Sequence, residues 1–151
     1  MKYTLPDFLA HSIAMEDEAA ERYLELADMM EAHNNLEVAT VFRDMCRFSQ
    51  LHRDSIRERA GSTELPKPHS WQFRWSAPPE VCDEDAFDYT LTPYQALQYA
   101  RENEQRAMEF YRSVTGNTDD AEVKRLSSEF AEEEQEHTEA LDKWLEKTPP
   151  D

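Results

Sequence analysis

A stretch near the end of the chain, Phe130–Leu141, places charged residues on an otherwise apolar helical face. It contains no Gly or Pro and consists mostly of strong helix formers, so it predicts a helix. Positions four, three, four and three residues apart share one face of that helix: Phe130, Glu134, His137, Leu141 and Trp144. A buried carboxylate is costly unless a cation or hydrogen bonds offset its desolvation. Because Glu and His both bind transition metals, the pattern predicts that other helices supply matching ligands.

The first and third expected helices, at about residues 5–33 and 93–115, share one pattern of residues on their apolar faces. Each carries a Glu, an Ala three positions later and a Tyr seven positions later: Glu16, Ala19 and Tyr23 in one, Glu104, Ala107 and Tyr111 in the other. The spacing places all three residues of each set on one face. The structural interpretation of the two tyrosines is that they are core aromatic residues whose hydroxyl groups bond a nearby carboxylate.

The second and fourth expected helices, at about residues 36–60 and 119–147, also correspond. Ser49 and His52 interrupt the apolar face of one helix where Glu134 and His137 interrupt the other. Two hairpins of similar design form a four-helix bundle with pseudo-twofold symmetry, which brings Glu16, His52, Glu104, Glu134 and His137 to its middle. The alternatives without metal are a hydrogen-bonded carboxylate network and, for His52, a satisfied core histidine.

The helices are expected at about residues 5–33, 36–60, 93–115 and 119–147, in a single all-α domain spanning residues 1–151. Between the second and third helices, residues 61–92 hold four of the eight prolines and five aromatic residues. This segment is too long for a hairpin turn. It predicts a crossover that packs along the bundle and reaches its far end.

Charge and composition exclude several classes of function. A net charge of −17 repels nucleic acid and anionic membrane surfaces, so neither is an expected partner. No stretch of about 18 apolar residues occurs and the N-terminus does not resemble a signal peptide, which predicts a cytoplasmic protein. Cys46 and Cys82 form no CxxC pair and are expected to have no chemical role. Three further histidines are expected at the surface: His11, His33 and His69.

On these residues the chain resembles the rubrerythrin branch of the ferritin-like di-iron carboxylate superfamily, in a form without a rubredoxin domain. The resemblance covers roughly residues 5–60 and 92–147. It depends on the two Glu-x-x-Ala-x-x-x-Tyr patterns and on the run Glu133-Glu134-Gln135-Glu136-His137. It implies a ferritin-like four-helix bundle with a long crossover between its second and third helices. It also implies two iron ions, with manganese or zinc as alternative occupants.

The chain departs from that family at two positions. The family has Glu-x-x-His on the second helix, where this chain has Ser49 and His52, and an extra glutamate on the third helix, where this chain has Ala107. By resemblance, Glu16 and His52 would bind one metal, Glu104 and His137 the other, and Glu134 would bridge them. Three carboxylates leave about one positive charge on two divalent ions uncompensated, so weaker or unequal binding is expected. Without the extra glutamate, peroxidase chemistry of the rubrerythrin kind is in question.

The expected function is therefore a di-iron oxidoreductase, either a ferroxidase or a peroxide-reducing enzyme, with an atypical site. Dioxygen or peroxide would be the oxidant, and an external protein the electron donor. Tyr23 and Tyr111 would orient the carboxylates, and the resemblance implies a homodimer. The alternative is a non-catalytic metal-binding or interaction bundle with a degenerate site, which Ser49 favours. A lipid or quinone hydroxylase has no support in the sequence.

Overall fold

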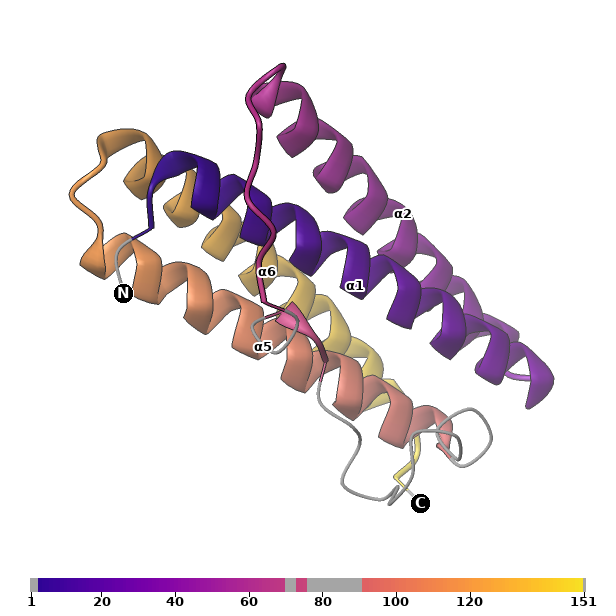
Figure 1. Cartoon of the computed structure of the whole chain (residues 1–151). Helices are drawn as coiled ribbons and strands as arrows, with labels where there is room; N and C mark the ends of the chain where they lie inside the picture. The colour runs from indigo at the N-terminus through magenta and orange to yellow at the C-terminus, as the bar shows by residue number, and fades with distance from the viewer. Residues whose placement is uncertain (1–2, 70–72, 76–90, 151) are drawn as a thin grey trace.

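The computed structural model describes residues 3–69, 73–75 and 91–150, and in these ranges it contains four long helices and no strand. The helices are α1 (Leu5–Ala32), α2 (Leu36–Ala60), α5 (Pro93–Asn117) and α6 (Ala121–Lys147). Helices α1 and α2 form one antiparallel hairpin and α5 and α6 form the other, and the two hairpins lie side by side (Figure 1). The four-helix bundle predicted from the sequence is confirmed.

Capping residues explain where the helices begin. The Thr4 side chain accepts a hydrogen bond from the Asp7 backbone, with Pro6 in the first turn of α1. Thr92 and Gln95 form a reciprocal capping box at the start of α5. Helix α6 begins at residue 121 and not near 119, because the Asp120 side chain caps the backbone N–H groups of the first turn.

The helix ends also differ slightly from the expected bounds. Helix α1 ends one residue early, before a turn in which Asn34 adopts a φ of 61°. Helix α2 ends at Ala60, as expected, and Gly61 caps it with a φ of 57°, which suits a residue without a side chain. Helix α5 continues through Gly116 to residue 117, two residues beyond the expected end.

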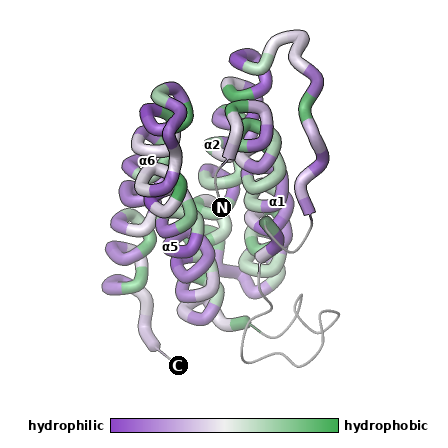
Figure 2. The backbone as a smooth tube through the Cα atoms, turned by 60° about the vertical axis from the view of Figure 1, so that its left-hand side comes forward, coloured by the Kyte–Doolittle hydropathy of each residue, from purple (hydrophilic) through white to green (hydrophobic). Residues whose placement is uncertain are grey.

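In the described ranges, the buried apolar residues form two clusters, separated along the bundle. One contains Tyr23, Leu26, Phe42 and Leu97 among others, and the second contains Phe8, Ile56, Tyr111 and Phe130 among others. Hydrophobic positions are most frequent along α1, and α5 and α6 alternate between hydrophilic and hydrophobic (Figure 2). Glu16 lies in α1 between Phe8 of one cluster and Tyr23 of the other, so the polar residues form a layer between two apolar ones.

The described part of the crossover leaves α2 at Gly61 and passes across α1 toward α5 (Figure 1). Trp75 packs the crossover against α1 and α5. Its ring packs edge-on against Tyr23 at 5.0 Å and Tyr99 at 5.4 Å, and its backbone N–H donates to Glu18 at 3.4 Å. Four residues considered in the sequence lie outside the described ranges: Trp71, Cys82, Phe87 and Tyr89.

The expectation that His11 lies at the surface is wrong. Its side chain is buried, with only 2% of the residue exposed. The ring stacks on Phe110, with the centroids 4.2 Å apart, and meets the edge of Tyr3 at 5.7 Å. Helix α1 is covered by α2, by α5 and by the crossover, so its buried face is wider than a single stripe. His33 and His69 are exposed, as expected.

Candidate metal centre

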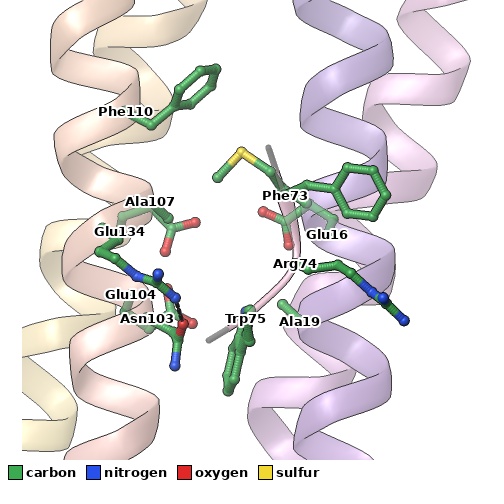
Figure 3. Close-up of a pocket in the computed structure, with 12 residues that line it drawn as sticks. Glu16, Ala19, Phe73, Arg74, Trp75, Asn103, Glu104, Ala107, Phe110 and Glu134 are labelled. Atoms are coloured by element: carbon green, nitrogen blue, oxygen red, sulfur yellow. Dashed lines mark hydrogen bonds between the residues drawn. The ribbon is translucent and has the colours of Figure 1, made fainter. Parts of the chain in front are cut away.

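The five predicted ligands meet in the polar layer between the two apolar clusters. Glu16, Glu104 and Glu134 are 4%, 5% and 4% exposed, so all three carboxylates are withdrawn from water. Glu16 on α1 faces Glu104 and Glu134 across the gap between the two hairpins (Figure 3). Ser49 on α2 is also buried, at 3% exposed, although it offers a hydroxyl group and no carboxylate.

In the first hairpin, His52 lies between two carboxylates. Its Nδ1 atom is 3.0 Å from Glu16 Oε1, and its Nε2 atom is 3.2 Å from Glu133 Oε2. The edge of Phe130 packs against the ring, with the centroids 4.5 Å apart and the planes at 89°. Contacts from α1 and α6 therefore fix the orientation of a side chain that belongs to α2.

In the second hairpin, His137 Nδ1 is 3.4 Å from Glu104 Oε2 and 3.4 Å from Glu134 Oε2. One ligand atom from each of these residues lies within 4.8 Å of the others, which is close enough for a single ion to reach all three. The hydroxyl group of Tyr23 donates to Glu104 Oε1 at 2.5 Å. Both histidines thus turn Nδ1 toward the buried carboxylates.

Burial and hydrogen bonding change the pKa values of these groups. Burial raises the pKa of the Glu16 carboxyl, and its hydrogen bond with His52 opposes that effect only in part. Burial alone would lower the pKa of His52, but Glu16 and the charge of Glu133 raise it overall. The pKa of His137 is raised by the same balance, mainly through Glu104. Both imidazoles therefore hold a proton more readily than a free histidine does, and a bound cation would compete with that proton.

The residues present fit a metal ion. Glu134 Oε2 and His137 Nδ1 are buried and have no hydrogen-bond partner among the described residues. Such buried polar atoms destabilise the protein when nothing satisfies them, and coordination to a cation would satisfy both. Imidazole nitrogens combined with carboxylate oxygens suit iron, manganese or zinc.

A cavity of about 150 Å³ opens beside the carboxylates, between α1 and α5. The small side chains of Ala19 and Ala107, which occupy equivalent positions in the repeat, line it from opposite sides (Figure 3). Phe73 and Trp75 of the crossover line it as well. The cavity is roomy enough to hold several water molecules or a small oxidant next to the carboxylates.

Sequence reasoning missed Glu133. It lies one position from Glu134, off the apolar face of α6, and its side chain is 48% exposed. Helical periodicity classes such a residue as solvated. The available signal was the repeat itself, since Glu133 corresponds to Phe48 in the first hairpin and breaks the symmetry there.

The rubrerythrin family model matches residues 7–73 and 95–151, which together span all four helices. The chain belongs to the rubrerythrin family. Its members belong to the ferritin-like di-iron superfamily, which makes this a metal-binding protein of that general kind, and rubrerythrins bind iron in di-iron sites.

Two solved structures resemble this rubrerythrin. An uncharacterized conserved protein from Magnetospirillum magnetotacticum MS-1 is 63% identical, with a TM-score of 0.91, and the match covers 99% of this chain and 98% of that one. The bacterioferritin of Rhodobacter capsulatus, solved with a metal-free dinuclear site and heme iron, is 18% identical with a TM-score of 0.72. That match covers 97% of this chain and 87% of the bacterioferritin, and it shows the ferritin-like fold. No curated protein matches this chain.

No helix in the described ranges of this rubrerythrin is both long enough and apolar enough to cross a membrane.

Proposed function

We propose that this protein binds two iron ions in the polar layer and acts as an oxidoreductase, either a ferroxidase or a peroxide-reducing enzyme. The observation that supports this most is the burial of three carboxylates beside two histidines, in a layer where only cations or hydrogen bonds could offset their desolvation. Bound iron would supply the redox electrons for reduction of dioxygen or peroxide.

The proposed ligand roles follow the two hairpins. Glu16 and His52 bind one ion, Glu104 and His137 bind the other, and Glu134 lies between them. Tyr23 orients the Glu104 carboxylate through its hydrogen bond at 2.5 Å, and that leaves the second oxygen of Glu104 toward His137. Tyr111 occupies the equivalent place in the repeat, but its hydroxyl group has no hydrogen-bond partner among the described residues, so the orienting role is proposed for Tyr23 alone.

Access and electron supply complete the proposal. The cavity between Ala19 and Ala107 gives a small oxidant a path to the carboxylates. Electrons are proposed to come from an external donor protein. The protein is proposed to be a cytoplasmic homodimer, and the partly exposed apolar residues Phe48 and Trp144 beside a groove between α2 and α6 support self-association.

The competing function is a metal-binding or interaction bundle without turnover. Ser49 favours it, because a buried hydroxyl group stands where the repeat has the carboxylate of Glu134. Manganese or zinc would then be as suitable as iron.

Anaerobic titration with Fe(II), followed by exposure to air, separates the two functions. We expect about two irons per chain, rapid uptake of oxygen and a rise in ferric absorbance. Analysis of the metal in protein purified without added metal identifies the physiological ion. One iron or none per chain, without oxygen uptake, would contradict the enzymatic proposal and leave the interaction bundle.

A further inference from the structure

Glu133 contacts His52, the proposed ligand whose helix has Ser49 where the other hairpin has the carboxylate of Glu134. It comes from α6, in the opposite hairpin, and its Oε2 atom lies 3.2 Å from His52 Nε2. Nδ1, on the other side of the ring, faces Glu16 at 3.0 Å. The contact is an ion pair and not a well-aligned hydrogen bond, since Nε2 has no hydrogen-bond partner among the described residues. A carboxylate can only accept, so its negative charge beside Nε2 still favours the tautomer with the hydrogen on that atom. That tautomer leaves the lone pair of Nδ1 free for a metal ion.

Among the described residues, His137 of the second hairpin has no equivalent of this contact. The residue that corresponds to Glu133 is Phe48, whose ring stacks on His137 with the centroids 6.3 Å apart. His137 already has two buried carboxylates near Nδ1, from Glu104 and Glu134. His52 has only Glu16 there, because position 49 on its own helix is a serine.

The charges of the site also indicate that Glu133 replaces the carboxylate missing at position 49. Glu16, Glu104 and Glu134 carry three negative charges against the four positive charges of two divalent ions. Glu133 supplies a fourth carboxylate within contact distance of a proposed ligand. Since its side chain is 48% exposed, solvent screens part of that charge, and its main effect is on the orientation of the ring.

We propose that Glu133 is a positioning residue that holds the His52 ring with Nδ1 toward the metal pair and so compensates for Ser49. The proposal deepens the proposed function, because it assumes that His52 binds one of the two ions. It predicts that loss of Glu133 weakens the binding of the ion held by His52 and leaves the binding of the other ion unchanged.

The test uses zinc, which binds without redox chemistry, in competition with a chromophoric chelator. We expect Glu133→Ala to lower the affinity for one of the two zinc ions by about 10- to 100-fold and to leave the affinity for the other unchanged. The affinity of Glu133→Gln for this zinc ion should lie between that of Glu133→Ala and that of the wild type, because the amide oxygen can still accept from Nε2. Glu136→Ala is the matched control, because it removes an exposed carboxylate from the same helix and should change neither ion. Circular dichroism of the metal-free variants verifies that each is folded.

A double-mutant cycle with His52→Ala distinguishes positioning from a general structural effect. If Glu133 acts through His52, Glu133→Ala should cause no further loss of affinity once the histidine is absent. Equal losses in both backgrounds, or an unchanged affinity in Glu133→Ala, would overturn the proposal. Neither result would bear on iron oxidation. Conversely, two zinc ions bound with the expected losses but no oxygen uptake with iron would contradict the enzymatic function and leave the role of Glu133 supported.

Discussion

The two hairpins are built to one pattern and differ at the positions that matter for chemistry. In α5–α6 the histidine has two buried carboxylates near Nδ1 and a tyrosine hydroxyl group bonded to one of them. In α1–α2 the histidine has one buried carboxylate near Nδ1 and an exposed one at its other nitrogen. The second hairpin is thus close to a complete metal site, and the first depends on a neighbour.

This difference shows that a repeated sequence pattern determines where a site lies in the bundle, but not which side chains the site contains. The same helical spacing brings Ser49 and Glu134 to equivalent buried places, at 3% and 4% exposed. Only the glutamate carries charge there. The two halves should therefore respond differently to equivalent substitutions.

The largest expected effect comes from Glu134, which lies between the two halves in the proposed arrangement. Glu134→Ala should abolish paired metal binding, because the residue provides a buried carboxylate that no other described side chain replaces. Isothermal titration with zinc measures the stoichiometry, and Glu136→Ala is the exposed control on the same helix. Two tightly bound ions in Glu134→Ala would contradict the bridging role.

Ser49→Glu would make the first half match the second. In metal-free protein the new carboxylate adds a fourth buried negative charge, and its nearest cation, His52, is already paired with Glu16, so the free energy of unfolding should fall by about 3–5 kcal/mol. Zinc should reverse the loss and bind more tightly or in higher stoichiometry than in the wild type. Urea unfolding with and without zinc measures both effects. Unchanged metal binding would count against the proposed equivalence of Ser49 and Glu134.

The two halves also differ where His11 in α1 corresponds to Tyr99 in α5. Burial lowers the pKa of His11 to about 4, from an ordinary value near 6.5. The unfolded chain therefore binds a proton that the folded protein does not. Stability should fall as the pH drops from about 6.5 toward 4, by up to roughly 3 kcal/mol.

The variant His11→Phe isolates this contribution. Its ring can keep the packing against Phe110 and Tyr3 but cannot take up a proton. The difference in unfolding free energy between variant and wild type should shift in favour of the variant as the pH falls below about 6.5. A difference that does not vary with pH would contradict the buried, neutral state of His11.

The smallest expected difference concerns the two tyrosines. Tyr23 donates to the Glu104 carboxylate, whereas the Tyr111 hydroxyl group is buried without a hydrogen-bond partner among the described residues. Tyr23→Phe should lower the free energy of unfolding by about 1.5–3 kcal/mol, and Tyr111→Phe should be nearly neutral. Urea unfolding of the two metal-free variants measures this, and equal losses would contradict the asymmetry.

Much of the fold and of the candidate site could be predicted before any coordinates. The four helices follow from apolar spacing and capping residues, and the level of the polar layer follows from where Glu16, Glu104 and Glu134 interrupt that spacing. The absence of a carboxylate at position 49 is also plain in the sequence. Each of these is local information, carried by the 3.6-residue period of a single helix.

Only the tertiary structure determined which side chains of one helix contact side chains of another. Periodicity assigns Glu133 to the solvated side of α6, yet that side approaches His52 of α2. It assigns His11 to the surface, yet α5 and the N-terminal segment cover it. The physical reason is that helical period defines the direction of a side chain around its own axis, and the rotation and separation of neighbouring helices determine what it meets.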